Sequence, residues 1–377
     1  MDLGFTEEQE MLRATARDFL ANECPKTLVK EMSDDEKGYT PELWGKIVEM
    51  GWVGLIFPKE YGGMGMGFMD LAVLLEEMGR GQLPGPYFST VLLGGIPILE
   101  VGSEEQKKEF LPKIARGQML VTLALTEPTS HYEAASIEVQ AIADQDDYLI
   151  SGTKLYVENA HIADLLICVA RTRHGATPED GITLFLVDAK SPGISITLLE
   201  TISGEKQCEV IFDRVRVPKK NILGELDQGW KVVQKVLQKA TVALCAEMAG
   251  GAQQVLEMSV SYAKERVQFG RPIGSFQAIQ HHCSNMAMDV DSSRYIVYKA
   301  ASKISKGLPC DMEVAMAKAW VSDAYRRVTA LGQQVHGGVG YTMEHDMPLY
   351  FKHAKVAEAT FGDADFHREI VARELGL

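Results

Sequence analysis

The sequence predicts an α+β protein built from several domains, and three observations lead to this prediction. The chain has 377 residues, which is long for one hydrophobic core and suits two or three domains. Apolar residues recur with a helical period up to about residue 120 and again after residue 224. Between these limits they alternate, as in strands. We therefore expect a helical domain over 1–120, a β domain over 121–225 and a second helical domain over 226–377.

The N-terminal region carries several helix-start signals. Thr6 followed by Gln9 fits a capping box, in which each side chain accepts from the other residue's backbone N–H. Residues 40–41 offer a second start, with Pro at the first helical position, and residues 103–106 offer a third. A further helix is expected over 68–78, after a Gly-rich loop. These signals predict a domain made of helices.

The middle region changes to an alternating pattern. Apolar and polar residues alternate over 137–142, as in a half-buried strand, and turn formers stand at 146–147 and 151–152. Further β-rich runs cover 165–170, 182–187 and 194–198. Because no helix-length segment separates these runs, we expect an antiparallel sheet, arranged as a barrel or a sandwich.

Helical periodicity returns after Gly224 and extends over longer segments. We expect helices over 229–266, 276–306, 312–335 and 348–375, the last with a break near Gly362. Long helices that are rich in Ala and Met and have short connections predict a four-helix bundle.

Composition and charge argue against several classes of function. The net charge of −14 disfavours nucleic acid or an anionic membrane as the main partner, because either needs a basic surface. The most apolar run, 91–101, is too short to span a bilayer, and the acidic N-terminus lacks the pattern of a signal peptide. The six cysteines are scattered without CxxC spacing, and the histidines lack metal-ligand spacing. We therefore expect a soluble cytoplasmic protein without a metal site.

The stretch 240–280 combines two kinds of chemistry. It begins with one carboxylate, Glu247, among Ala, Leu, Cys, Met and Gly residues, and it ends in a cationic, aromatic run. Burial beside apolar groups raises the pKa of a carboxylate and strengthens it as a base. The guanidinium of Arg266 can fork onto phosphate, and the phenyl ring of Phe269 can pack on a flat heterocycle. The stretch therefore predicts a catalytic base beside an anionic, planar ligand.

Eight segments carry a resemblance to a known family because they occur in the right order and spacing. They are FPKEYGGMGMG, GSEEQKKEFLPKIARGQ, LALTEP, SGTKLYVENA, FDRVRVPKKNILG, ERVQFGRPIGSFQAIQ, QQVHGGVGYT and IVARELG. Over essentially its whole length the chain resembles the acyl-CoA dehydrogenase family. The resemblance implies an N-terminal helical domain, a central β-barrel, a C-terminal four-helix bundle and a tetramer built as a dimer of dimers. It also implies FAD as cofactor, α,β-dehydrogenation of an acyl-CoA thioester and an electron-transfer protein as acceptor.

The resemblance also implies individual residues of the FAD site. Arg266, Gln268 and Phe269 match positions that hold the pyrophosphate and adenine of FAD bound mainly by a neighbouring subunit. The other implied cofactor positions are Leu125, Thr126, Tyr156, Glu158, Phe276, Gln277, Gln334, Val335, Gly337, Gly338, Asp363 and Asp365. Because acids near a flavin phosphate would repel it, Asp363 and Asp365 are expected to face the ribityl hydroxyls or to cap the last helix.

The chain departs from the family pattern beside the flavin. Many relatives have a small Gly-Ser pair where this chain has His131-Tyr132, and a Thr that would bond the flavin edge where it has Glu158. The resemblance places Tyr132 at the substrate. These larger and charged side chains suggest a bulky, cyclic or branched acyl group.

A second departure concerns the catalytic base. The usual glutamate of the family is replaced by Phe361, followed by Gly362, and the base position of a minority of members is Ala240, followed by Thr241. These four residues are expected to contact substrate. Glu247 is the natural replacement, because it follows Ala240 by seven residues and so lies two turns along the same helix face. In this it is similar to the heterotetrameric acyl-CoA dehydrogenases that act on steroid side chains.

Three other interpretations stay open. Glu247 could pair with an Arg or Lys across the bundle and have no catalytic role. The chain could be a non-catalytic subunit that lends FAD contacts to a related partner in a heterotetramer, although a homotetramer fits equally. It could also be an acyl-CoA lyase on the same scaffold that keeps FAD only as a structural group.

Overall fold

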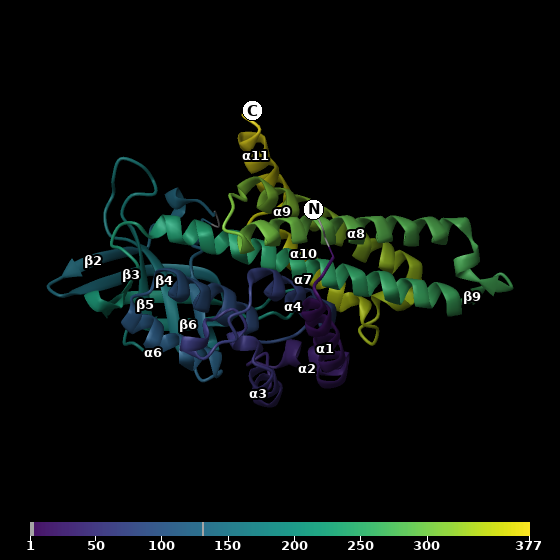
Figure 1. Cartoon of the computed structure of the whole chain (residues 1–377), viewed down its shortest axis with the longest axis horizontal. Coiled ribbons are helices and arrows are strands. Elements are labelled where there is room, and N and C mark those ends of the chain that lie inside the picture. Colours follow the sequence, from purple (N-terminus) through teal and green to yellow (C-terminus); the bar gives the residue numbers. More distant parts are fainter. Residues whose placement is uncertain (1–3, 130–131) are drawn as a thin grey trace. The chain divides into compact units, whose positions relative to one another are not determined.

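The structure confirms an α+β architecture. The computed structural model describes residues 4–129 and 132–377 (Figure 1). The chain divides into two compact units. The bundle unit consists of Met1–Glu31, Gly67–Leu83 and Thr241–Leu377, and the sheet unit consists of Met32–Met66 and Pro84–Ala240. The domain boundaries expected near residues 120 and 225 stay predictions.

The bundle unit contains the long helices that the periodicity predicted. The helix α7 (Gly229–Glu265) belongs to this unit from Thr241 onward. It is followed by α8 (Gln277–Ser305), α9 (Asp311–His336), α10 (Met347–Ala359) and α11 (Ala364–Glu374). The unit also contains two N-terminal helices, α1 (Glu7–Glu23) and α4 (Phe68–Gly81). α8 and α9 run alongside each other (Figure 1). The predicted break near Gly362 separates α10 from α11.

Local signals set the helix starts as predicted. Thr6 forms the expected capping box at the start of α1, and Ser103 forms another at the start of α6 (Glu104–Ala115). Thr40 caps α3 (Pro41–Glu49), whose first residue is the expected proline. Each cap satisfies a backbone N–H that has no partner within its own helix.

Several short helical segments were not predicted. They are α2 (Lys26–Asp34), a π-helical segment (Ser89–Gly95) and α5 (Ile96–Val101). Residues 89–98 are buried throughout, so they lack the alternation between an apolar and a polar face by which a surface helix is recognised. Short 3₁₀ turns lie at Trp52–Gly54, Lys59–Tyr61, Ala134–Ser136, Ala160–Ile162, Lys219–Asn221, Ile273–Ser275 and Gly337–Tyr341.

The sheet unit holds one eight-stranded sheet. Its strands are β1 (Val121–Ala124), β2 (Gln140–Asp144), β3 (Asp147–Glu158), β4 (Leu165–Arg171), β5 (Ile182–Asp188), β6 (Ile194–Leu199), β7 (Gln207–Pro218) and β8 (Ile222–Leu223). The hydrogen-bonded order is β6-β7-β3-β2-β4-β5-β8, and β1 pairs with β4. The expected barrel is not supported, because within the described residues no pairing joins β6 to β8 and the sheet is open.

Two further expectations about the sheet were wrong. The sheet is mixed, since β1 pairs with β4 in parallel. A parallel pair needs no helical crossover here because the β2–β3 hairpin lies between these strands in the sequence. Residues 151–152 are not a turn: β3 continues through them with a register shift between Ile150 and Gly152. Gly152 has φ +140°, and a Cβ there would stand 2.7 Å from Val139 Cγ2, so glycine permits the close approach.

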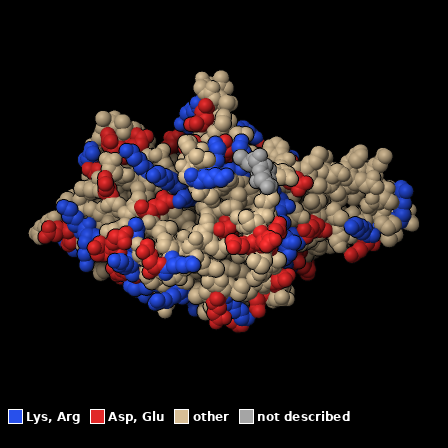
Figure 2. Space-filling model, in the orientation of Figure 1, with Lys and Arg blue, Asp and Glu red and all other residues tan. Residues whose placement is uncertain are grey.

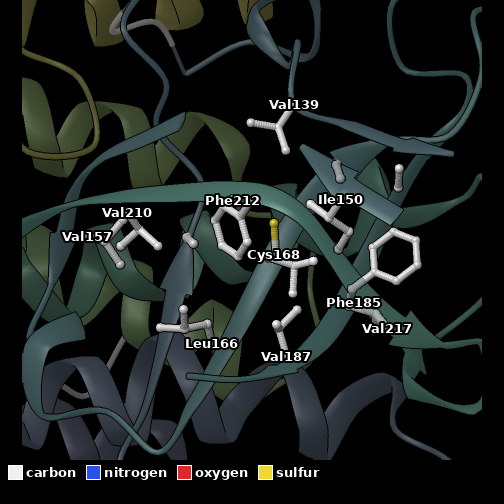
Figure 3. Close-up of a cluster of buried hydrophobic side chains, with 14 of the residues drawn as sticks. Val139, Ile150, Val157, Leu166, Cys168, Phe185, Val187, Val210, Phe212 and Val217 are labelled. Atoms are coloured by element: carbon white, nitrogen blue, oxygen red, sulfur yellow. The ribbon is translucent and has the colours of Figure 1, made fainter. Parts of the chain in front are cut away.

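A buried cluster of apolar side chains forms the core of the sheet unit (Figure 3). Alternate residues of β3 and β7 supply much of it, as the period of two requires. Ile150, Cys168, Phe185 and Val210 are fully buried there. The core thus fixes the positions of the strand ends that carry predicted site residues.

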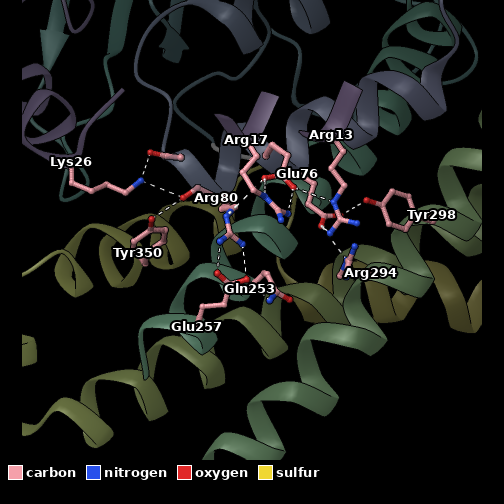
Figure 4. A network of polar contacts seen from close by, with 12 residues as sticks. Arg13, Arg17, Lys26, Glu76, Arg80, Gln253, Glu257, Arg294, Tyr298 and Tyr350 are labelled. Atoms are coloured by element: carbon pink, nitrogen blue, oxygen red, sulfur yellow. Dashed lines mark hydrogen bonds and ion pairs between the residues drawn. The ribbon is translucent and has the colours of Figure 1, made fainter. Parts of the chain in front are cut away.

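The bundle unit contains a network of buried ion pairs on α4 (Figure 4). The side chain of Glu77 is 1% exposed and accepts hydrogen bonds from Arg13 and Arg17 of α1. Glu76 pairs with Arg294 of α8. Other members are Arg80, Gln253, Glu257 and Tyr298. Because each buried carboxylate has a cationic partner, the network ties α4 to α1, α7 and α8.

The described residues include no helix that is long and apolar enough to cross a membrane. On the face drawn in Figure 2, Lys and Arg are interspersed with Asp and Glu. Because charges of both signs are mixed on this face, an anion-binding site there would have to be formed by a few local groups.

Candidate active site

The backbone around Glu247 is fixed by contact with α4. The residues that flank Glu247 on α7 are buried, and Glu247 itself is half-buried. A Cβ built on Gly79 of α4 would stand 2.0 Å from the Glu247 carbonyl oxygen. One built on Gly250 would stand 1.7 Å from the Glu76 carbonyl oxygen. Only glycine fits at these two positions, so the two helix backbones meet directly at the turn that carries the predicted base.

A buried lysine holds the segment that follows α10. Lys318 of α9 is fully buried, and its Nζ donates to the carbonyl oxygens of Ala357, Glu358 and Gly362 at 2.9 Å each. It also donates to the Ser322 hydroxyl at 3.1 Å. Desolvation lowers the pKa of Lys318 to about 8. The ammonium group therefore satisfies carbonyls that the end of α10 leaves without helical partners.

Phe361, a predicted substrate residue, has an uncommon backbone conformation. Its φ is +59°, and the residue is 9% exposed. His367 Nε2 donates to the Phe361 carbonyl oxygen at 2.9 Å. Desolvation lowers the pKa of His367 to about 4, so the imidazole is neutral and carries its proton on Nε2. The structure thus fixes the backbone at Phe361, whose side chain is apolar.

The two acids predicted near the cofactor interact with α11. Asp363 is the N-cap of that helix, and its carboxylate accepts from the Phe366 backbone N–H at 2.9 Å. The expected capping role of Asp363 is confirmed. Asp365 forms an exposed ion pair with Arg368. Neither interaction shows whether the two acids contact FAD, so that contact stays a prediction.

Cys245 lies two residues before Glu247 and is fully buried. Desolvation raises the pKa of its thiol to about 12, although Lys318 lowers it. A thiol that stays protonated is a packing group rather than a nucleophile. Ala240 and Thr241, the predicted substrate residues one to two turns earlier on α7, are also buried.

In the sheet unit, a buried ion pair supports the predicted flavin residues Leu125 and Thr126. Lys154 is fully buried, and its Nζ donates to Glu127 at 2.7 Å and to the Leu125 carbonyl oxygen at 2.9 Å. The Leu155 N–H donates to the Thr126 carbonyl oxygen at 2.8 Å. The segment after β1 is therefore bonded to β3 along its length.

The end of β3 carries two further predicted cofactor residues. Tyr156 has φ +56° and is 50% exposed, beside a register shift between β3 and β7. Glu158 is half-buried, and desolvation followed by the charge of Glu205 raises its pKa to about 8. Tyr132 is half-buried, whereas His131 lies outside the described residues.

The predicted adenine contacts lie on a two-stranded hairpin, β9 (Val267–Gln268) and β10 (Arg271–Pro272). Arg266 and Gln268 are exposed, and Phe269 is 92% exposed with φ +55°. Phe276 is half-buried, and its ring lies 4.2 Å from the Arg271 guanidinium. Gln277 begins α8 and is exposed. An almost fully exposed phenyl ring is available to a ligand or to another chain.

The predicted glycine-bearing loop, 334–338, consists of the last three residues of α9 and the two glycines after it. Gln334 is exposed and Val335 is buried. Gly337 has φ +62°, and a Cβ on it or on Gly338 would meet nothing within 4 Å. Both glycines are exposed, so their backbone is open to a ligand. Residues 334–338 and the β9–β10 hairpin belong to the same unit.

Other features do not add to this site. A cavity of about 870 Å³ lies in the sheet unit beside β2 and the loop 172–178, and no predicted site residue lines it. Arg171 in its lining already donates to four carbonyl oxygens. Among residues 4–129 and 132–377, no group of three His, Cys, Asp or Glu residues could hold a metal ion.

The sequence analysis missed Lys154, Glu127 and Lys318, which hold the backbone at predicted site residues. Lysine is almost never fully buried unless its charge is paired, so a single lysine in a strand or helix indicates a solvated face. The partners that bury these lysines are distant in the sequence. Of these three residues, only Glu127 lies in a segment, LALTEP, that the sequence had singled out through its resemblance to the family.

Known proteins match this arrangement along the whole chain. Three family models match: the N-terminal domain of acyl-CoA dehydrogenase over residues 6–118, the middle domain over 122–215 and the C-terminal domain over 227–376. The chain is 34% identical over 380 residues to a probable acyl-CoA dehydrogenase, YngJ, of Bacillus subtilis, with 100% of both proteins covered. The chain therefore belongs to the acyl-CoA dehydrogenase family.

Two further relatives extend the comparison. The chain is 33% identical over 384 residues to an acryloyl-CoA reductase (NADH) of Anaerotignum propionicum, covering 100% of this chain and 96% of the relative. The solved structure of butyryl-CoA dehydrogenase from Megasphaera elsdenii superimposes with a TM-score of 0.93 at 30% identity and covers 100% of both chains. The family thus includes dehydrogenases and reductases of acyl-CoA thioesters.

Proposed function

We propose that this chain removes hydrogen across the α–β bond of an acyl-CoA thioester, with FAD as cofactor and Glu247 as the base. Family membership supports the reaction class. The observation that supports the base is the place of Glu247 on a buried turn of α7, half-buried and fixed by Gly79 and Gly250. Partial burial raises the basicity of a carboxylate while leaving it within reach of a substrate.

In this proposal the Glu247 carboxylate takes the α-proton, and the β-hydrogen leaves with its electron pair. FAD, when bound, supplies the acceptor for that hydride. Glu247 is half-buried between buried residues of α7, which keeps the carboxylate from being fully solvated. In the reductive direction, as in the name of the acryloyl-CoA relative, the protonated Glu247 would return the proton to the α-carbon.

The residues present fit FAD. The Arg266 guanidinium can fork onto a pyrophosphate, and the exposed ring of Phe269 can pack on adenine. The open backbone of Gly337 and Gly338 can approach phosphate oxygens. Because Phe269 is 92% exposed within its own chain, the proposal assigns this hairpin to FAD bound mainly by a neighbouring subunit.

The assembly we propose is a tetramer, formed by four copies or by this chain with a related subunit. An electron-transfer protein would reoxidise the flavin, and the cytoplasm is the proposed location. A bulky, cyclic or branched acyl group is proposed from Tyr132, Glu158 and Phe361 alone. The names of the acryloyl-CoA and butyryl-CoA relatives do not support a bulky acyl group. Sequence identity also does not place this chain nearer to the steroid enzymes than to the short-chain enzymes.

The test is Glu247→Gln in the purified, FAD-replete protein. Flavin bleaching is followed anaerobically with butyryl-CoA, 2-methylbutyryl-CoA, 3-phenylpropionyl-CoA and a steroid-side-chain CoA thioester. We expect the fastest of these reactions to fall about 10²–10⁴-fold, which is the range for loss of a general base. Glu265→Gln, at the exposed end of the same helix, is the control and should keep the wild-type rate.

The same experiment separates the rival functions. A wild-type rate in Glu247→Gln rejects the base assignment. A chain that binds no FAD until a related subunit is added supports the non-catalytic role. Conversion of a thioester without any bleaching of the flavin supports the lyase.

A further inference from the structure

The turn of α7 that carries Glu247 is contacted by two other helices of the bundle unit, α4 and α9. Gly251 follows Glu247 by four residues and so lies one turn along the same face. A Cβ on Gly251 would stand 2.3 Å from Tyr325 Oη. The tyrosine hydroxyl of α9 therefore occupies the space where any other residue at position 251 would place its side chain.

Tyr325 is fully buried, and its hydroxyl contacts His353 of α10. Tyr325 Oη lies 3.2 Å from His353 Nδ1, and the ring centroids are 5.7 Å apart. The same Nδ1 lies 3.5 Å from the side-chain Nε2 of Gln82. An amide nitrogen only donates, so Nδ1 accepts and the imidazole proton is assigned to Nε2. Desolvation lowers the pKa of His353 to about 4, which keeps the ring neutral near pH 7.

Gln82 closes the connection back to the Glu247 turn. It follows α4 with φ +55°, and its Nε2 donates to the Gly79 carbonyl oxygen at 2.8 Å. Gly79 is the residue whose Cα lies directly against the Glu247 backbone. The chain Gly79–Gln82–His353–Tyr325–Gly251 thus starts at a residue of α4 that contacts Glu247 and ends on the turn 247–251 itself, and the hydrogen bonds within it join neutral groups.

We propose that Tyr325, His353 and Gln82 form a polar bridge that positions the turn 247–251 of α7, and with it the Glu247 carboxylate, against the substrate. The inference rests on the proposed role of Glu247. A displacement of about 1 Å at a reacting group can cost about 10²-fold in rate, so a small movement of this turn has a measurable effect. The three residues are positioning residues, since none of them is assigned a contact with substrate.

Tyr325→Phe tests the bridge, and Tyr350→Phe is its matched control. Tyr350 is equally buried and lies on α10, but its hydroxyl donates to the Arg80 carbonyl oxygen, outside the bridge. Both variants lose one buried tyrosine hydroxyl. Flavin bleaching is measured with the thioester of the panel that reacts fastest with the wild type, in its protio form and with deuterium on the α-carbon.

We expect Tyr325→Phe to slow bleaching about tenfold and to raise the ratio of protio to deuterio rates, because a displaced base makes α-proton transfer more limiting. FAD content and the half-saturating thioester concentration should stay within about twofold of wild type. Gly251→Ala, which displaces the same hydroxyl without removing it, should give the same signature. Tyr350→Phe should leave both the rate and the isotope ratio unchanged.

A purely structural role for Tyr325 would lower the thermal midpoint in both tyrosine variants alike and would leave the isotope ratio at its wild-type value. That result would show that the bridge proposal is wrong. If Glu247→Gln is inactive in the same assay, the assignment of Glu247 as the base still holds. If Glu247→Gln reacts at the wild-type rate, both proposals are wrong.

Discussion

Single buried residues hold the backbone in both units. Lys154 and Lys318 have no exposed surface. Lys154 donates to the Leu125 carbonyl oxygen, and Lys318 donates to three carbonyl oxygens of the segment 357–362. A buried charge is tolerated only when its hydrogen bonds are made. Each lysine therefore requires the backbone conformation that its own hydrogen bonds stabilise. Their removal leaves carbonyl oxygens buried without donors.

Lys318→Met keeps the length of the side chain and removes its three donors. We expect the free energy of unfolding to fall by about 3 kcal/mol, because three carbonyls of the segment 357–362 lose their partner. The measurement is denaturation by urea at pH 7. Lys355→Met removes an exposed lysine of α10 that pairs with Glu358 and should change the free energy by less than about 0.5 kcal/mol. Equal effects of the two substitutions would contradict the role of Lys318.

The sequence predicted residues well where their chemistry is local. The capping box at Thr6 and the helix start at Ser103 formed as expected, since the residues that cap each helix lie within one turn. Asp363 was expected as a cap and is one. Lys318 could not be recognised because the three carbonyl oxygens that accept from it lie 39–44 residues further along the chain. No local pattern encodes such a distance.

At the scale of elements, the crossing of α4 and α7 decides where Glu247 lies. Direct backbone contact leaves no room for adjustment by side-chain rotation, unlike a crossing between larger residues. The ion pairs of Glu76 and Glu77 hold α4 to its other neighbours, so α4 serves as a fixed support for α7. A substitution at the crossing should therefore affect both stability and the proposed chemistry.

Gly79→Ala places a methyl group 2.0 Å from the Glu247 carbonyl oxygen. We expect a loss of about 1–3 kcal/mol in the free energy of unfolding from overpacking, together with slower flavin bleaching. Gly81→Ala, on the same helix, meets its nearest atom, Leu20 Cβ, at 3.4 Å. It should be neutral or stabilise by up to about 1 kcal/mol through helix propensity. In urea denaturation we expect a lower free energy of unfolding for Gly79→Ala and an unchanged or higher one for Gly81→Ala. A loss of similar size in both variants would contradict this prediction.

Element prediction succeeded where a period is long and failed where strand pairing decides. The helices α7, α8 and α9 were predicted within about two residues at their ends, because a 3.6-residue period repeats many times in each. The sheet was expected to be antiparallel and closed. Neither the parallel pairing of β1 with β4 nor the open ends at β6 and β8 leaves a trace in a single strand's sequence.

At the scale of the whole molecule, two desolvated, neutral histidines make stability depend on pH. The pKa values of His353 and His367 are lowered by desolvation to about 4, below the ordinary value of 6.5. Between pH 6.5 and 4 the unfolded chain binds protons that the folded chain does not. The free energy of unfolding therefore falls as the pH drops through this window, by up to about 3 kcal/mol for each histidine.

His367→Gln should remove part of this pH dependence. We expect its free energy of unfolding to fall less than that of the wild type between pH 6.5 and 4, by about 1–3 kcal/mol. The measurement is urea denaturation at half-unit pH steps. His281→Gln, an exposed position of α8, is the control and should follow the wild-type curve. A parallel fall in all three proteins would contradict the assignment to His367.

The open sheet has a consequence for how the chain behaves before it is fully folded. β6 (Ile194–Leu199) pairs with β7 on one side, and within the described residues no strand covers its other side. Its sequence, ISITLL, has high β propensity and no charge, which is the composition of segments that nucleate aggregation. Pro192 precedes it and Glu200 follows it, and such residues act as gatekeepers against edge-to-edge pairing. Pro192 and Glu200, two residues outside the candidate site, are therefore expected to limit edge-to-edge pairing of β6.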